Sequence, residues 1–254
     1  IVITHPMIYN TVYGSLLGEA DGVWSVSSTG YWATRVLTDV FKKYPQVIDF
    51  GGHLHFPLQD PRSIWQGDFT VLGCASVRYM AIEAAGYEDM SSTTVMKDCN
   101  EFSQGNLLQF DKNGNMRVLR MDFYNNAVIG EALTAQYPDR ETKANLVPYN
   151  HTTRSLANAA PKLSDLIVSL EDGIVTAKWA AGTDDEFVHD YTVTLKQGGN
   201  VIAIKKILAD FYKYPQTSSM KKQYSVNLGT VSLLSPFQVT LEAVDSWGAK
   251  ATLT

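Results

Sequence analysis

The first half of the chain combines short apolar runs with one stretch of helical spacing. Residues 1–4 and 47–50 are apolar runs that predict short β-strands. Between them, apolar side chains recur at helical spacing after a cap at Ser28 or Thr29, and Pro45 ends the pattern; the apolar positions are Ala33, Val36, Leu37, Val40, Phe41 and Tyr44. Strand, helix and strand in this order predict a βαβ unit, which brings the ends of two parallel strands to one edge of a sheet.

Turn residues divide the region that follows. Residues 69–72 predict a further strand, and residues 107–111 and 116–123 predict a hairpin, because Asn-Gly at 113–114 tolerates the positive φ angles of a tight turn. Residues 7–28 predict a long loop over the strand ends. Residues 86–104 are irregular and fit either a lid or an ordinary connector.

From residue 161 onward the pattern becomes strictly alternating. Apolar residues at 175, 177 and 179, at 191, 193 and 195, and at 237, 239, 241 and 243 predict short strands of a β-sandwich. The polar stretch before them has no clear period, so we predict a first domain at 1–147, a linker at 148–160 and a second domain at 161–254. Asn150 begins a weak glycosylation pattern in that linker. His189 stands among acidic residues and is interpreted as a solvated strand-edge residue.

Composition narrows the class of protein. An apolar content of 45% and a charged content of 19% are those of a globular chain, and a net charge of −5 argues against a nucleic-acid surface. The sequence contains no run of 18 apolar residues, so we predict no membrane span. Cys74 and Cys99 fit either a disulfide or two unrelated thiols, and the second alternative is favoured. Because the chain opens within a core-like strand at Ile1, we expect a fragment or a processed product.

Three histidines follow the first two strands and are the candidate metal ligands. His5 ends the first apolar run, and His53 and His55 come after the second run and two glycines. In an extended segment residues i and i+2 point to the same side, so the two later imidazoles can face one point. Neutral imidazole is the commonest metal ligand, and strand ends are the usual ligand site of open α/β sheets.

These motifs resemble the C-terminal half of the catalytic domain of calcineurin-like metallophosphoesterases. The resemblance rests on T-H-P around His5, G-H-L-H at 52–55, D-P-R-S-I-W-Q at 60–66 and the hairpin at 106–123, and it covers roughly residues 1–130. It implies an α/β (α+β) metallophosphoesterase-type sandwich, truncated at its N-terminus, with two divalent metals (Mn, Fe or Zn) at the strand ends. By this resemblance His5 and His53 would bind one metal and His55 the other.

The resemblance also implies that part of the centre is missing. The family's Asp-x-His, G-D-x-x-D and G-N-H elements, with its general acid, would precede Ile1 and are absent from this sequence. The isolated chain is therefore expected to be inactive, and to keep a missing segment bound or to self-associate. Residues 161–254 resemble a fibronectin type III-like sandwich with core residues Trp179 and Tyr191, although Phe237 replaces the corner tyrosine.

The expected activity is metal-dependent hydrolysis of phosphate mono- or diesters by the parent protein, on a phosphorylated small molecule. The alternative is a non-catalytic scaffold whose sandwich binds a protein or a glycan. Tyr9 and Asn10 could reach a substrate phosphate, although ordinary loop packing is the more common role of such residues. Asp60 and Arg62 favour a local ion pair over phosphate binding. An accessory sandwich with two cysteines leans towards an extracytoplasmic, bacterial location.

Overall fold

The chain divides into two compact units. The computed structural model describes residues 1–15, 33–136 and 151–254. The first unit comprises Ile1–Ala85 and Met90–Ala157, and the second comprises Gly86–Asp89 and Asn158–Thr254. The change of unit after Ala157 falls within the predicted linker 148–160, where helix α2 (His151–Ala157) now lies. The glycosylation pattern at Asn150 lies outside the described residues.

The structure is mostly β. Strands hold 42% of the described residues and helices 10%, in several antiparallel sheets, so the α/β (α+β) metallophosphoesterase-type fold class predicted from the sequence is wrong. The described α-helices are short: α1 (Thr38–Phe41) spans 4 residues and α2 spans 7. The error lies mainly in the crossover segment after residue 32.

That segment forms a strand and a short helix in place of the predicted long helix. Strand β3 (Ala33–Thr34) pairs in parallel with β2 (Met7–Ile8), and α1 is a single turn. Only part of the apolar stripe is buried: Phe41 is 5% exposed, whereas Val36 is 80% exposed. The β-branched residues here also suit an extended backbone, and pairing with β2 outweighs the weak helical preference of the segment.

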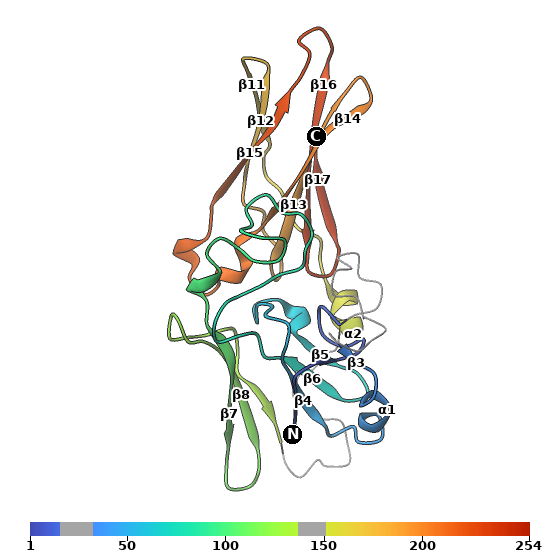
Figure 1. Ribbon diagram of the computed structural model, residues 1–254, viewed down its shortest axis with the longest axis vertical. Helices are drawn as coiled ribbons and strands as arrows, with labels where there is room; N and C mark the ends of the chain where they lie inside the picture. Colours follow the sequence, from blue (N-terminus) through green and yellow to red (C-terminus); the bar gives the residue numbers. More distant parts are fainter. Residues whose placement is uncertain (16–32, 137–150) are drawn as a thin grey trace. The chain divides into compact units, whose positions relative to one another are not determined.

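A sheet with three parallel strands carries the candidate site. Its order is β1-β4-β6-β5, where β1, β4 and β6 are parallel and β5 is antiparallel (Figure 1); the strands are β1 (Val2–Thr4), β4 (Ile48–Gly51), β5 (Ile64–Gln66) and β6 (Thr70–Gly73). Parallel strands end at a common edge, so the segments after Thr4, Gly51 and Gly73 meet there. The short 3₁₀ helix η1 (Pro61–Ser63) precedes β5.

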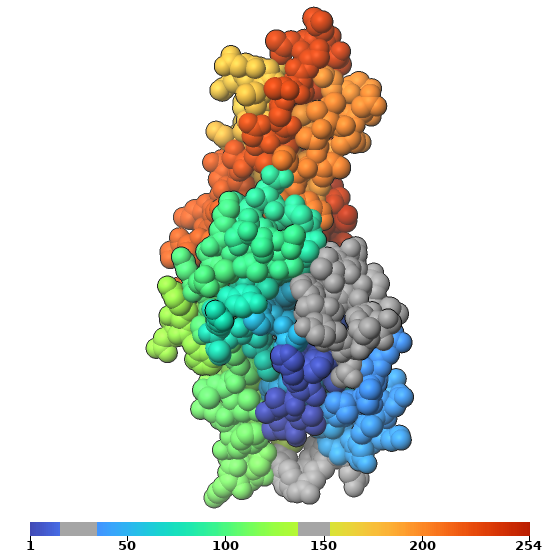
Figure 2. Space-filling view, viewed as in Figure 1, coloured from blue at the N-terminus to red at the C-terminus, as the bar shows by residue number. Residues whose placement is uncertain are grey.

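A second, antiparallel sheet packs on the first within this unit. It contains the predicted hairpin, and Gly114 takes a φ of 86° in the hairpin turn. The strands of this sheet are β7 (Gln104–Phe110), β8 (Met116–Asp122), β9 (Ala127–Val128) and β10 (Leu133–Ala135). The short 3₁₀ helix η2 (Cys99–Glu101) precedes them. One core forms between the two sheets, from Ile48, Phe50, Leu72, Met116 and Val118. A second core includes Met7, Ile8, Phe41, Phe69 and Val71. Figure 2 shows the first residues of the chain exposed at the surface of this unit.

The second unit is a two-sheet β structure. One sheet has the order β11-β12-β15 and the other β14-β13-β16-β17; the strands are β11 (Ile167–Glu171), β12 (Ile174–Ala180), β13 (Val188–Gln197), β14 (Asn200–Leu208), β15 (Gln223–Thr230), β16 (Phe237–Asp245) and β17 (Lys250–Leu253), with η3 (Asp210–Lys213) and η4 (Thr217–Ser219) between β14 and β15. The predicted alternation is present in β12, where Val175, Ala177 and Trp179 are all 0% exposed. Trp179 stacks on Tyr224 at 5.7 Å between ring centroids, within one continuous core.

Two further properties bear on the class of protein. Cys74 and Cys99 are both free, as the favoured alternative expects. Within residues 1–15, 33–136 and 151–254, none of the helices reaches the length and apolarity that crossing a membrane requires.

Candidate metal centre

His5 and His53 meet at the common edge of the parallel strands. The backbone N–H of Gly52 donates to the carbonyl of Thr4 at 3.0 Å, which joins the two turns just beyond β1 and β4. His5 Nε2 then lies 2.8 Å from His53 Nδ1, with the rings nearly perpendicular and their centroids 4.8 Å apart. The sequence therefore correctly placed two of its candidate ligands side by side, 48 residues apart in the chain.

A tight turn aims the His53 ring. The N–H of Leu54 donates to the carbonyl of Gly52 at 2.8 Å, and His53 between them has a φ of 70°. A bond from residue i+2 to residue i around a positive φ defines a γ-turn of the rarer, strained kind, which surrounding structure must hold in place. Gly51 contributes by lacking a side chain, since a Cβ there would lie 2.6 Å from Met7 Sδ.

His55 has the environment of a metal ligand. It is half-buried, its ring lies 4.2 Å from that of Tyr79, and the Tyr79 backbone partly offsets the lowering of its pKa. Its Nδ1 is buried and has no hydrogen-bond partner among the described residues. Metal-binding histidines characteristically give one ring nitrogen to a backbone carbonyl and the other to the ion.

The electrostatics favour the neutral imidazole. Burial lowers the pKa of His53, and the positive charges of His5 and His55 lower it further. Burial also lowers the pKa of His55; the hydrogen bond to Tyr79 partly opposes this, and the charge of His5 adds to it. Since a metal binds the deprotonated imidazole, both shifts reduce the competition from protons.

The spacing of the donor nitrogens is close to that of ligands on one metal ion. Within the described residues, no three His, Cys, Asp or Glu side chains already cluster as a metal site. Two nitrogens on one tetrahedral zinc lie about 3.3 Å apart, given Zn–N bonds of about 2.0–2.1 Å. The His5–His53 separation of 2.8 Å needs to open by roughly half an ångström to match this ion. The two imidazoles therefore fit an ion after a small ring movement, with the buried His55 Nδ1 as the third candidate donor.

Tyr9 and Asn10 have structural roles in the loop after β2. Tyr9 packs against the apolar core, and the guanidinium of Arg35 lies 3.9 Å from its ring centroid. Asn10 has a φ of 55°, and its N–H donates to the carbonyl of Ser15 at 2.7 Å, which closes the loop. Contact of either residue with a substrate phosphate stays a prediction.

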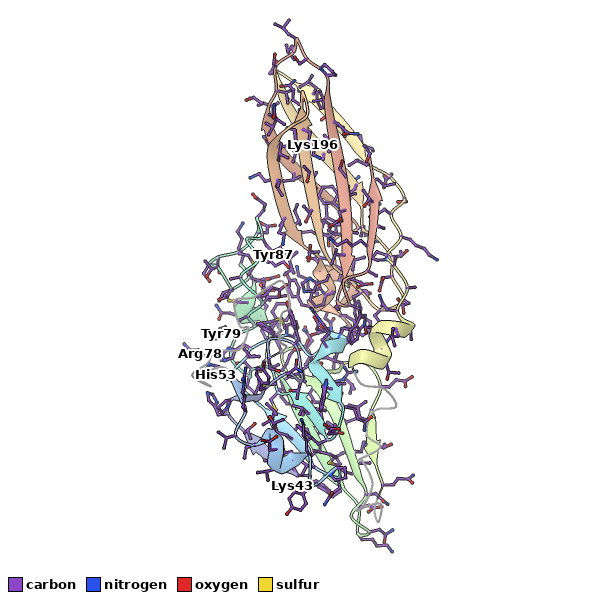
Figure 3. The ribbon with its side chains drawn as sticks, turned by 90° about the vertical axis from the view of Figure 1, so that its right-hand side faces the viewer. Lys43, His53, Arg78, Tyr79, Tyr87 and Lys196 are labelled. Carbon is purple, nitrogen blue, oxygen red and sulfur yellow. The ribbon has the colours of Figure 1, made fainter. Side chains whose placement is uncertain are left out.

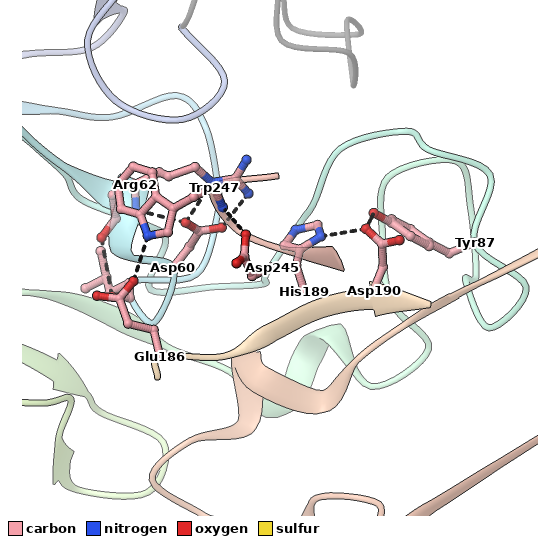
Figure 4. A network of polar contacts seen from close by, with 10 residues as sticks. Asp60, Arg62, Tyr87, Glu186, His189, Asp190, Asp245 and Trp247 are labelled. Carbon is pink, nitrogen blue, oxygen red and sulfur yellow. Dashed lines mark hydrogen bonds and ion pairs between the residues drawn. The ribbon is translucent and has the colours of Figure 1, made fainter. Parts of the chain in front are cut away.

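Asp60 and Arg62 form the local ion pair that the sequence favoured. Arg62 donates Nε to Asp60 Oδ1 at 3.0 Å and Nη2 to Oδ2 at 2.7 Å (Figure 4), and both side chains are buried. The Arg62 guanidinium also lies 3.4 Å from the centroid of the Tyr13 ring. A bidentate, buried pair of this kind shapes the loop before β5.

Sequence reasoning missed a buried carboxyl beside the site. Asp49 of β4 is 0% exposed, and Thr4 Oγ1 donates to its Oδ2 at 3.1 Å. Burial raises the pKa of Asp49 to about 6, against a small lowering from the Thr4 hydrogen bond. The residue sits inside an otherwise apolar strand, so only its charge in that context marks it in the sequence.

The loop from Cys74 to Ala81, which the sequence does not mark, is attached to the histidine segment. Its first N–H, from Cys74, donates to the carbonyl of Gly51 at 2.9 Å, and its last, from Ala81, donates to the carbonyl of His55 at 3.0 Å. Both ends of the loop are therefore attached to the segment that carries His53 and His55. No pattern in the sequence indicates this attachment.

His189 of the second unit differs from its predicted state. It is 3% exposed, so the interpretation as a solvated edge residue is wrong. A register shift between Val188 and Asp190 makes a β-bulge at His189, and its Nδ1 lies 2.9 Å from Asp190 Oδ2. Tyr87 donates its hydroxyl to the same oxygen at 3.2 Å (Figure 4). This buried set of residues holds the 86–89 segment on the unit.

Comparisons with known proteins identify no family. No family model matches the chain, and no curated protein sequence is significantly similar to it. Among solved structures, one similar chain is the crystal structure of the MHC-like MILL2, at 14% sequence identity and a TM-score of 0.25. That match covers 60% of this chain and 66% of the MILL2 chain. A likeness this slight carries no argument about fold or function.

Proposed function

We propose that this chain supplies the histidine side of a metal centre that hydrolyses phosphate esters. The observation that carries the proposal is the 2.8 Å approach of His5 Nε2 and His53 Nδ1 at the carboxyl edge of parallel strands. The sequence resemblance of T-H-P and G-H-L-H to metallophosphoesterase motifs supports the same chemistry. The proposal rests on the site alone and not on the fold class, because one fold can support many activities.

Each histidine has a defined task in this proposal. His5 Nε2 and His53 Nδ1 hold the ion directly, and the γ-turn at residue 53 keeps the second ring pointed at the first. His55 offers its buried Nδ1, and its ring lies 4.2 Å from the ring of Tyr79. A divalent ion bound there would polarise a phosphoryl oxygen and lower the pKa of a bound water.

Neutral imidazoles alone suit a single ion of the zinc type. Imidazole suits Zn and Fe, whereas Mn prefers oxygen ligands, and a bridged pair of divalent ions needs anionic ligands in addition to these histidines. The described histidines therefore support one ion directly. The second ion, the identity of the metal and the choice between mono- and diesters stay parts of the proposal.

The proposal is tested by metal binding and hydrolysis on the same protein. Zn²⁺ and Mn²⁺ are titrated by calorimetry, and the natural full-length protein is assayed with p-nitrophenyl phosphate and bis(p-nitrophenyl) phosphate. We expect at least one equivalent of metal, lost in His53→Ala, and hydrolysis of one ester that depends on added metal. Wild-type protein that binds no metal would refute the proposal and leave a non-catalytic binding role.

A further inference from the structure

We propose that Arg78 binds the phosphoryl group of the substrate at the histidine site. This inference deepens the proposed function and rests on it. Arg78 lies in the middle of the 74–81 loop, whose two ends are hydrogen-bonded to Gly51 and His55. Figure 3 shows His53, Arg78 and Tyr79 on the same side of the first unit.

The backbone around Arg78 is fixed from several directions. Its own N–H donates to Ser76 Oγ at 3.2 Å. The carbonyl of Ser76 accepts from the N–H of Gln104 at 2.8 Å, and the carbonyl of Val77 accepts from Ser103 Oγ at 2.9 Å. On the other side, Met80 donates its N–H to the carbonyl of Cys99 at 3.1 Å. The loop backbone therefore needs little further ordering when a ligand binds, and the entropy cost falls on the Arg78 side chain alone.

The guanidinium of Arg78 is uncommitted. It is exposed, and within the described residues it makes no hydrogen bond, ion pair or ring contact. Other arginines of the first unit contact a partner through their guanidinium groups. Arg35 lies on the Tyr9 ring, Arg62 pairs with Asp60, Arg117 donates to Gln109, and Arg120 donates to the carbonyl of Leu58. An exposed guanidinium without competing partners suits a phosphate, because its planar donors match two phosphate oxygens at once.

Tyr79, which follows Arg78 in the chain, contacts the candidate ligand His55. The ring centroid of Tyr79 lies 4.2 Å from that of His55. Arg78 is therefore one residue away from a direct contact of a candidate ligand. The substrate feature that this pairing of an ion and a guanidinium recognises is a phosphoryl group with at least two unesterified oxygens.

The test separates phosphate binding from metal binding. Inorganic phosphate is titrated by calorimetry into the Zn²⁺-loaded protein, and Zn²⁺ alone is titrated into the metal-free protein. The variants are Arg78→Ala, Arg78→Lys and the charge-matched control Lys43→Ala, which removes another exposed cation of the same unit. Circular dichroism melting checks that each variant is folded.

We expect Arg78→Ala to weaken phosphate binding by roughly tenfold or more and to leave Zn²⁺ affinity within about twofold. Arg78→Lys should be intermediate, because it keeps the charge and loses the two-point contact. Lys43→Ala should match the wild type. Unchanged phosphate affinity in Arg78→Ala, with Zn²⁺ bound, would overturn the inference and leave the proposed function standing. A wild type that binds neither Zn²⁺ nor Mn²⁺ would instead overturn the proposed function, and this inference with it.

Discussion

Two clusters of polar side chains contain histidine, one in each unit, and they differ in what surrounds the imidazole. The first contains His5, His53 and His55, and the second contains His189. In the second unit His189 is 3% exposed and lies against a carboxylate, with Asp190 Oδ2 at 2.9 Å. In the first unit His5 is exposed, His53 lies 2.8 Å from it, and His55 keeps a buried Nδ1 without a partner among the described residues. A histidine closed by a carboxylate is part of a structural network, whereas histidines that face one another can accept an ion.

The carboxylate explains why the second cluster is closed. Burial alone would raise the pKa of Asp190, but the hydrogen bond and charge of His189, the charge of Lys206 and the hydroxyl of Tyr87 together lower it. These neighbours therefore stabilise the charged form of the Asp190 carboxylate. In the first cluster burial and the charges of neighbouring histidines lower the pKa of His53 and of His55.

The largest expected effect is on metal binding in the first cluster. His53→Ala removes one of two converging nitrogens and should reduce Zn²⁺ affinity roughly 100- to 1,000-fold, if about 10–16 kcal/mol is shared among four ligands. Competition with a chromogenic chelator measures this. His5→Ala should give a similar loss, and an affinity unchanged in both variants would show that the ion binds elsewhere.

The next effect is on stability in the second cluster. Asp190→Ala leaves the Tyr87 hydroxyl and His189 Nδ1 without their common acceptor and should destabilise the second unit by about 3 kcal/mol. Amide hydrogen exchange along β13 and β16 reports it. Tyr87→Phe is the milder control, expected to cost about 1 kcal/mol. Both variants should bind Zn²⁺ like the wild type, and a loss of Zn²⁺ affinity in either would break the distinction between the clusters.

Asp49, beside the first cluster, should make the stability of the protein depend on pH. Its pKa is raised to about 6 from an ordinary value of 3.8, so the folded protein holds more protons than the unfolded chain between these values. Stability should therefore fall as pH rises from about 4 to about 6, by on the order of 2–3 kcal/mol, and then level off.

The matched variant Asp49→Asn isolates this contribution. It keeps the shape of the side chain and removes the titration, so the difference in unfolding free energy between it and the wild type should grow in the variant's favour from pH 4 to pH 7. Urea unfolding at several pH values measures the difference. A constant difference across that range would mean that the carboxyl titrates normally in the folded state.

The smallest expected effect concerns the orientation of His55. Tyr79→Ala removes the ring that lies 4.2 Å from the imidazole and should lower Zn²⁺ affinity by about tenfold, as losses of ligand-orienting contacts do. Tyr79→Phe keeps the ring and should behave like the wild type. Equal affinities in all three proteins would show that the Tyr79 ring does not orient His55 for the ion.

The sequence predicted those features whose cause is local. The turn at Asn113-Gly114 and the alternation of β12 follow from residue conformation and period, and both are present. The positions of His5 and His53 follow from strands that end at one edge. The predicted helix was wrong because Ala33–Thr34 found a strand partner in Met7–Ile8, a pairing that no local preference encodes.

Features that depend on distant contacts were not predictable in this way. His189 is buried because a β-bulge turns it and because Tyr87, about a hundred residues earlier, reaches Asp190. The attachment of the 74–81 loop to Gly51 and His55 uses backbone groups, which carry no sequence signature. The features that mark Arg78 are its exposed guanidinium and the contact of its neighbour Tyr79 with His55, and both depend on the folded structure.

The most direct test of the metal centre is anomalous X-ray scattering at the zinc edge from crystals of the Zn²⁺-loaded chain. The account predicts a peak about 2.0–2.1 Å from His5 Nε2 and His53 Nδ1, with the two nitrogens moved apart from 2.8 Å to about 3.3 Å. A peak at another site, or a His5–His53 hydrogen bond that persists at saturating zinc, would contradict it.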